Sequence, residues 1–428
     1  MSDEYLKVFC DKSIYVSSGS EIEYIEGPQS EVARHNQERV KSVLGSGWLD
    51  EIINNCILTS EENELVDEKH RKILYKLVES ITSEVGRAIV GLTILQLTIK
   101  SIIPQQSIRL HKASNNHASF SWKDGIPMRV LDKTYITPKL REYNLLKLNA
   151  DGFMMTRSLA ENYPYTSLYK ANIRGAKAEW IKIVNIIENN PKIALPSLKL
   201  VITFLKNRSE MFERKVNETL ERVDAFIDSS TDKTILRNKL FSFPSISSYS
   251  ARLFEILIHS FYNTVLCNDD LFLFLKPLSQ MRSANKKHGD IGDIELLERP
   301  NSMIIIEAWD AKYGKSYLRD ELEELKDKLE AHPETRIAGF ITNEEPNLNK
   351  EILERKSELE EIYGINIKIK SIHTWYNDVI LEYNIVNEIE FLKSWTKMFF
   401  DYLCLKQYSI APIDEPTYNW IEECISVL

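Results

Sequence analysis

The sequence predicts an α/β protein in which a mixed β-sheet flanked by helices follows a largely helical N-terminal region. Two observations carry this prediction. Before residue 245, apolar residues recur mainly at helical spacing, whereas after residue 250 short apolar segments of strand length alternate with amphipathic helical segments. The length of 428 residues exceeds what one ordinary core supports. We therefore expect two domains, residues 1–245 and residues 246–428.

The N-terminal region is expected to start irregularly and to become helical over residues 64–98. Residues 101–165 are rich in turn-forming dipeptides, and helical spacing returns over residues 166–240. Residues 241–250 are rich in serine and contain Pro244, so we predict that they form a linker.

The C-terminal region changes its apolar period several times, which predicts alternating helices and strands. Its second and third strands are close enough in sequence to form a hairpin, so the sheet is expected to be of mixed direction. The predicted helices are residues 251–266, 317–331 and 348–363, the predicted strands are residues 271–275, 293–298, 303–312, 337–342 and 365–369, and residues 383–428 are predicted to be helical.

The composition excludes several classes of protein. The longest strongly apolar window, residues 88–99, is too short to cross a bilayer, and the acidic N-terminus does not resemble a signal peptide, so we expect no membrane partner. The five scattered cysteines form no Cys-x-x-Cys pair, so a reducing cytoplasm is the expected location. The sequence contains no glycine-rich phosphate-binding loop, so no nucleotide cofactor is expected.

The charge of the chain is unevenly distributed. The net charge of −9 argues against a nucleic-acid partner. Residues 101–180, however, contain 12 Lys and Arg against 6 Asp and Glu, a net charge of +6. A polyanion responds to local charge more than to the total charge. Residues 101–180, here called the basic island, therefore predict a surface that contacts DNA.

A helix capped by Thr166 and running to about Glu188 is predicted at the end of the basic island. Basic side chains recur on one of its faces, and further basic and aromatic side chains precede it. Such a face suits phosphate contacts, and arginine suits guanine edges in the major groove, although a merely solvated helix face is the alternative. The expected DNA-binding residues are Arg157, Tyr163, Tyr165, Lys170, Arg174 and Lys177.

Asp310 and Lys312 stand at the exit of a predicted buried strand. The pattern of an acid, any residue and a lysine is common, and it also occurs on four expected helix surfaces. Asp310-Ala-Lys312 differs because it follows the apolar run of residues 303–309. Alternation along a strand places both charged side chains on one face. Charged side chains at the end of an apolar strand cost free energy, unless they are paired with opposite charges or take part in binding or catalysis.

The predicted hairpin adds a second acid to this pair. If the chain turns near residues 301 and 302, paired residue numbers add up to about 603, which places Asp293 opposite Asp310. Two carboxylates held close together repel each other and favour a divalent cation between them. Magnesium prefers one or two carboxylates with water and phosphate oxygens. Lys312 would stabilise charge on the phosphate or orient or deprotonate the attacking water.

Residues 289–296 and 304–312 together resemble the PD-(D/E)xK nuclease motif, and the surrounding helix and strand order resembles the restriction-endonuclease-like fold. The resemblance covers about residues 250–380. It implies that Asp293 and Asp310 bind the metal and that Lys312 assists the attack. Gly292 stands where the family's loosely kept proline would be. Asp290 remains a second candidate for the first acid, because another turn would shift the register.

Many members of this family also use a glutamate from the preceding helix. The resemblance therefore implies that Glu255, a lone acid in an apolar run, is a fourth member of the site. His259 follows one turn later. The alternative is that both residues form a polar pair that faces a neighbouring element.

The expected function is that of a type II restriction endonuclease that hydrolyses double-stranded DNA with magnesium. Cutting both strands of a duplex needs two catalytic sites or two successive binding events at one site, so a homodimer is expected. One alternative is a structure-specific repair or recombination nuclease with the same chemistry. The other is a non-catalytic DNA-binding protein whose acidic cluster is structural.

Overall fold

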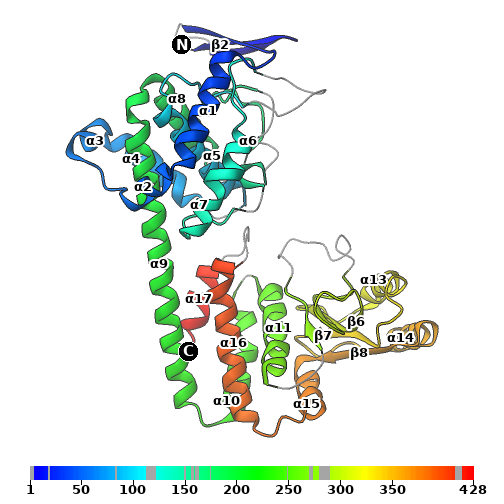
Figure 1. Cartoon of the computed structure of the whole chain (residues 1–428). Coiled ribbons are helices and arrows are strands. Elements are labelled where there is room, and N and C mark those ends of the chain that lie inside the picture. Colours follow the sequence, from blue (N-terminus) through cyan, green and yellow to red (C-terminus); the bar gives the residue numbers. More distant parts are fainter. Residues whose placement is uncertain are drawn as a thin grey trace. The chain divides into compact units, whose positions relative to one another are not determined.

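The computed structural model describes residues 4–17, 20–81, 84–111, 122–148, 151–155, 159, 163–173, 175–247, 249–268, 273–278, 290–409 and 417–428. The chain is mixed α/β and mostly helical, as predicted (Figure 1). It divides into two compact units. Unit 1 comprises residues 1–213 with residues 408–414, and unit 2 comprises residues 214–407 with residues 415–428.

Unit 1 contains a small sheet and a larger set of helices. Its strands are β1 (Tyr5–Val8), β2 (Lys12–Ser17) and β3 (Ser20–Ile25). Its helices are α1 (Glu31–Gly45), α2 (Trp48–Asn54), α3 (Ser60–Leu65), α4 (Glu68–Glu79), α5 (Glu84–Ile102), α6 (Met128–Leu131), the π-helix η1 (Asp132–Ile136), α7 (Thr137–Glu142), the 3-10 helix η2 (Gly152–Met155), α8 (Lys177–Asn189), the 3-10 helix η4 (Pro191–Ile193) and the first part of α9 (Ala194–Ser229).

The N-terminal segment, predicted to be irregular, is a three-stranded antiparallel sheet in the order β1-β2-β3. Its inner face buries Tyr15 and Tyr24, which belong to one hydrophobic cluster with Leu110 and Trp122. Edge-to-face packing of Tyr24 on Trp122 contributes to this cluster. The apolar partners of these strands come from about one hundred residues downstream, so the local sequence alone does not reveal them.

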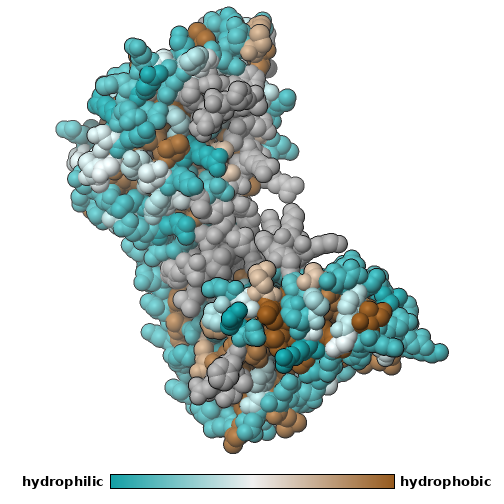
Figure 2. Space-filling view, turned by 45° about the vertical axis from the view of Figure 1, so that its right-hand side comes forward, coloured by the Kyte–Doolittle hydropathy of each residue, from teal (hydrophilic) through white to brown (hydrophobic). Residues whose placement is uncertain are grey.

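Helix α5 is the central helix of unit 1. Residues 85–102 are long and apolar enough to cross a membrane, but 78% of this window is buried inside the protein. A helix that is apolar on all sides suits the core of a domain. On the face drawn in Figure 2, hydrophilic side chains (teal) cover most of the described surface, and the apolar patches are small.

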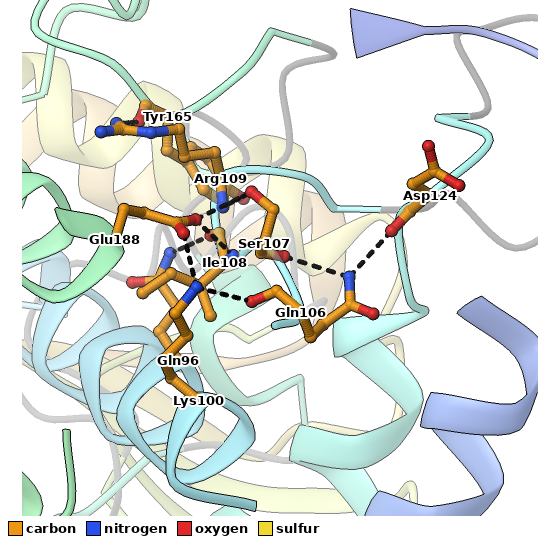
Figure 3. Close-up of polar contacts among 9 residues, drawn as sticks. All are labelled: Gln96, Lys100, Gln106, Ser107, Ile108, Arg109, Asp124, Tyr165 and Glu188. Atoms are coloured by element: carbon orange, nitrogen blue, oxygen red, sulfur yellow. Dashed lines mark hydrogen bonds and ion pairs between the residues drawn. The ribbon is translucent and has the colours of Figure 1, made fainter. Parts of the chain in front are cut away.

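A buried polar network anchors the segment that follows α5 (Figure 3). The ammonium group of Lys100, whose side chain is 3% exposed, lies 2.6 Å from Glu188 Oε2 and donates to the Gln106 carbonyl at 3.0 Å. Glu188 Oε1 accepts from the Ser107 hydroxyl at 2.8 Å and from the Ile108 backbone N–H at 2.7 Å. A buried charge is tolerated when it is paired and hydrogen-bonded, as it is here.

Unit 2 contains the sheet predicted for the C-terminal region. Its strands are β4 (Phe274–Leu275), β5 (Ile294–Leu297), β6 (Ile305–Lys312), β7 (Ile337–Thr342) and β8 (Asn366–Ser371). Its helices are the end of α9, α10 (Lys233–Ile246), α11 (Ser250–Asn268), α13 (Arg319–Leu329), α14 (Lys350–Tyr363), α15 (Ile372–Glu382), α16 (Glu388–Ser409) and α17 (Thr417–Ile425).

The linker predicted over residues 241–250 is wrong. Most of its described residues belong to the end of α10, and α11 begins at Ser250. Pro244 lies inside α10, where a proline removes one backbone hydrogen bond. The neighbouring Phe243 is fully buried and stacks on Phe399 at a centroid distance of 5.5 Å. This packing stabilises a helix that the serine and proline content argues against.

The sheet of unit 2 has the strand order β4-β5-β6-β7-β8. Strand β5 is antiparallel to both of its neighbours, β4 and β6, whereas β6, β7 and β8 are parallel. This is the mixed direction that the sequence predicts. The parallel part places the carboxyl ends of β6 and β7 at the same edge of the sheet.

Different helices cover the two faces of this sheet (Figure 1). On one face, Tyr262 of α11 donates its hydroxyl to Glu307 Oε1 of β6 at 2.8 Å. On the other face, Ala308 and Phe340 share a hydrophobic cluster with Leu322 and other residues of α13 and α14. Since Asp310 has the same parity as Ala308 and pairs with Phe340, it lies on the face that α13 and α14 cover.

We expect Glu188→Gln to lower the free energy of unfolding by about 3 kcal/mol, because it leaves the buried Lys100 ammonium without its carboxylate. Urea denaturation measures this change. Adding Lys100→Met should restore part of the lost stability. The control is Glu38→Gln, which breaks the exposed Lys41–Glu38 pair and should change stability by less than about 1 kcal/mol. Wild-type stability of Glu188→Gln would contradict the role of this network.

Candidate active site

The predicted hairpin is present and has the predicted register. Strands β5 and β6 pair antiparallel, with Ile294 opposite Trp309. One residue further along, the chain brings Asp293 beside Asp310. The backbone N–H of Ala311 donates to Asp293 Oδ2 at 3.0 Å. Asp293 is therefore attached to the end of β6 by a backbone donor, one residue beyond Asp310.

Two lysines lie beside these carboxylates. Lys312 Nζ lies 3.1 Å from Asp310 Oδ2, so the predicted triplet of Asp293, Asp310 and Lys312 is brought together. Lys328 Nζ, from α13, lies 3.7 Å from the same oxygen. It also donates to the Ile291 carbonyl at 2.8 Å. Lys328 thus connects the loop before β5 with the acid at the end of β6.

The electrostatics of the site fix the charge of its two central groups. Burial raises the pKa of the Asp310 carboxyl, but its contact with the Asp293 carboxyl and the ammonium groups of Lys312 and Lys328 outweigh burial and hold the pKa below its ordinary value. Burial lowers the pKa of Lys312, but the Asp310 carboxylate more than offsets this and leaves the pKa raised. At neutral pH, Asp310 is an anion and Lys312 is a cation.

Asp290, the second candidate for the first acid, has a different environment. Its Oδ1 lies 2.7 Å from Lys276 Nζ, which also lies 2.7 Å from Glu295 Oε2. Glu295 Oε1 in turn accepts the backbone N–H of Ile291. Asp290 therefore belongs to a buried ion cluster that holds the loop before β5. This geometry favours Asp293 as the first acid.

Gly292, which stands where the motif that this segment resembles would place a proline, lies close to the partner strand. A Cβ atom at this position would lie 2.5 Å from the backbone oxygen of Trp309, on the partner strand. Contacts this short require the backbone to shift, so any side chain, including proline, is excluded from the observed arrangement. The absence of a side chain at Gly292 allows the loop to approach β6.

Glu255 and His259 both lie on α11, and the structure shows polar partners for each. Glu255 Oε1 pairs with the guanidinium of Arg252 on the same helix. His259 Nε2 lies 2.8 Å from the Lys276 carbonyl and must donate to it, while Nδ1 lies 3.1 Å from the Tyr402 hydroxyl. His259 therefore positions the residue that holds Asp290. The role of Glu255 as a fourth member of the site stays a prediction.

The residues at the end of β6 fit a magnesium ion. Asp293 and Asp310 are two carboxylates in contact, and like charges in contact are unfavourable unless a proton or a cation lies between them. Magnesium takes hard oxygen ligands and completes its octahedron with water and phosphate oxygens. Among the described residues, no group of three or more His, Cys, Asp or Glu side chains could hold a metal ion. A magnesium ion at the end of β6 would have Asp293 and Asp310 as its protein ligands.

Lys276 and Lys328 were missed by sequence reasoning. Neither lies in an acid-x-Lys pattern, and Lys328 is one of several charged residues on an amphipathic helix. In the sequence, Lys328 lies three residues after Leu325, which belongs to the apolar stripe of α13. This spacing directs the Lys328 side chain toward the sheet. This position distinguishes Lys328 from the more peripheral lysines of the helix.

The helix predicted from Thr166 is wrong. Helix α8 begins at Lys177, and Thr166 is buried in an irregular segment. The reason is aromatic packing, because Tyr165 and Tyr169 both pack edge-to-face on Trp180 of α8. This packing places Tyr165 and Tyr169 against the first turn of α8 instead of in an extension of the helix.

The predicted DNA-binding residues separate into three groups. Tyr165 is fully buried and donates its hydroxyl to the Leu159 carbonyl at 2.7 Å, so it is a core residue. The ammonium group of Lys177 donates to the Tyr169 and Ala171 carbonyls, which indicates a structural role. Lys170 is exposed and lies over the half-buried ring of Tyr163. The remaining two predicted residues, Arg157 and Arg174, lie outside the described residues.

No protein-family model matches this chain, and no curated protein matches it in sequence. Its function is therefore inferred from the geometry of the site.

We expect millimolar magnesium to stabilise unit 2 through Asp293 and Asp310. At tenfold above its Kd, a ligand raises the free energy of unfolding by about 1.4 kcal/mol, which corresponds to a Tm shift of roughly 3–5 °C for a unit of this size. The shift should disappear in Asp310→Asn and Asp293→Asn and persist in Asp290→Asn. Calorimetry of each variant with and without magnesium measures it. A shift lost in Asp290→Asn but kept in Asp293→Asn would reverse the assignment of the first acid.

Proposed function

We propose that this chain is a type II restriction endonuclease of the PD-(D/E)xK superfamily that cuts double-stranded DNA with magnesium. The single observation that carries the proposal is the convergence of Asp293, Asp310 and Lys312 where β5 and β6 meet. A strand order in which an antiparallel hairpin precedes two parallel strands supports a restriction-endonuclease-like core for unit 2.

In this proposal the reaction is hydrolysis of a phosphodiester. A water oxygen forms a new bond to phosphorus while one ester P–O bond breaks. Bound magnesium would lower the pKa of the water and stabilise the negative charge on the phosphate. Asp293 and Asp310 hold that ion by their carboxylates. Lys312, whose raised pKa keeps it protonated, donates to the phosphate or orients the water.

The partners and the location follow from the same proposal. Cutting both strands of a duplex requires two sites, and one site per chain makes a homodimer the simplest arrangement. The five cysteines are all free, which suits a reducing compartment and supports a cytoplasmic location. The surface residues Tyr163 and Lys170 remain candidates for DNA contact.

Asp310→Ala and Lys312→Ala should each lower the rate of DNA cleavage at least about 100-fold, because each removes a group that stabilises charge in the transition state. The assay is digestion of several large unmethylated DNAs with magnesium, which should give discrete bands for the wild type. The control is Glu324→Ala with Lys326→Ala, which destroys a surface copy of the acid-x-Lys pattern and should leave the rate unchanged.

The proposal fails if the wild type cuts none of these DNAs, or if Asp310→Ala cuts at the wild-type rate. Cleavage of flaps or junctions without cleavage of plain plasmid would support the repair nuclease instead. Binding of DNA that neither magnesium nor Asp310→Ala affects would support the non-catalytic protein.

Lys328 is expected to act as a positioning residue, because it touches both Asp310 and the loop that carries Asp293. Lys328→Ala should lower kcat by about tenfold and raise the magnesium concentration needed for half-maximal cleavage. Lys328→Arg should recover part of both. Titration of magnesium in a cleavage assay measures the effect, with Lys326→Ala on the same helix as control. An unchanged magnesium requirement would indicate a structural role only.

A further inference from the structure

A lysine-rich pocket of about 700 Å³ lies in unit 1 between α4 and α8, which pack against each other. Four of its seven lining residues are lysines. The lining residues are Lys69, Lys72, Ile73, Lys76, Lys182, Asn185 and Ile186. This volume is in the range of ligand pockets, but four ammonium groups around an apolar floor suit a polyanion.

The folding of α4 explains why its lysines gather. His70, Leu74, Leu77 and Val78 are buried against the core of unit 1. The helical period then directs the lysines at positions 69, 72 and 76 to the side of α8, at steps of three and four residues. They cover about 10 Å along the helix axis. Lys182 faces them from α8.

The charge of this pocket is not neutralised. Among the described residues, the one ion pair involving these lysines joins Lys72 to Glu68 at 3.6 Å. Both side chains of that pair are more than 70% exposed, so the pair is weak and screened by solvent. The lining residues of the pocket include four ammonium groups and no carboxylate. These ammonium groups attract a partner with several negative charges.

Asn185 of α8 also lines the pocket. Its Oδ1 atom is buried and has no hydrogen-bond partner among the described residues. Because Oδ1 can only accept, a water or an ammonium group can satisfy it, and the N–H₂ group is the part of this side chain that can donate to a phosphate oxygen.

We propose that this pocket binds the sugar–phosphate backbone of double-stranded DNA. The proposal rests on the proposed nuclease function and names the surface that holds the substrate. Each strand of a duplex carries about three phosphates per 10 Å of helix axis, which matches the length over which the lysines of α4 lie. Lysine is a flexible point charge that contacts phosphates without reading bases, so this surface positions the duplex.

The distribution of charge along the sequence does not reveal this surface, because its lysines lie in segments that are not strongly basic overall. Lys69, Lys72 and Lys76 belong to residues 1–100, which contain 11 Lys and Arg against 17 Asp and Glu. Lys182 lies just beyond the basic island. Folding joins four lysines from outside the basic island into one surface.

The test is binding of a fluorescently labelled DNA duplex in EDTA, measured by anisotropy at several salt concentrations. Lys69→Gln, Lys76→Gln and Lys182→Gln together should raise Kd at least about tenfold and reduce the slope of log Kd against log salt by about two to three. The matched control neutralises Lys7, Lys12 and Lys41, three lysines of the same unit outside the pocket. Its Kd and slope should stay close to those of the wild type.

Lysine footprinting of the wild type provides a second measurement that needs no variant. Duplex DNA should protect Lys69, Lys76 and Lys182 from acetylation and leave Lys7 and Lys41 reactive. The proposal is overturned if the triple variant binds DNA with the wild-type Kd and the wild-type salt slope. It is also overturned if ATP, a small polyanion, protects these lysines from acetylation and duplex DNA does not.

The two proposals can fail separately. If the wild type cuts DNA and the triple variant binds and cuts equally well, the pocket proposal is wrong and the nuclease remains. If the lysines are needed for binding but no DNA is ever cut, the pocket proposal stands and the nuclease is wrong.

Discussion

The antiparallel pairing of β5 with β6 is the interaction on which the candidate site depends. Backbone hydrogen bonds between these strands fix where Asp293 lies relative to Asp310, and the Ala311 N–H adds a bond to Asp293 itself. Two carboxylates would not approach each other on their own account, because like charges repel. The hairpin and the buried strands around it supply the free energy that holds them in place. A register shift of one residue would move one acid to the other face of the sheet and separate the two carboxyl groups.

Each unit buries charge, but in a different pattern. In unit 1, Lys100 and Glu188 are opposite charges, and both oxygens of Glu188 accept hydrogen bonds, so the group is satisfied within the protein. In unit 2, the end of β6 brings two carboxyl groups together, and the ammonium groups of Lys312 and Lys328 help hold the pKa of Asp310 below its ordinary value. The first pattern uses both oxygens of its carboxylate within the protein. The second leaves two adjacent carboxyl groups that offer oxygen ligands to a divalent cation, which is the physical reason to propose a metal site there.

The sequence predicted what depends on local periodicity and chain direction. Strand β7 has the predicted bounds, and the hairpin has the predicted register, because alternation and turn position are encoded locally. The predicted linker failed because buried contacts of Phe243 outweigh the serine and proline content around it. The helix expected from Thr166 failed because Tyr165 and Tyr169 turn back to pack on Trp180, a contact that helical periodicity does not show. Two of the predicted DNA-binding residues, Tyr165 and Lys177, turn inward, because a window of sequence does not show which side chains do so.

The close approach of Gly292 to the Trp309 backbone has an evolutionary consequence. Where a side chain at this position would collide with the partner strand, mutation to any other residue demands a simultaneous change in strand spacing. A chain with another residue at this position would carry Asp293 in a displaced loop. Position 292 is therefore closed to the single substitutions that an open surface position accepts.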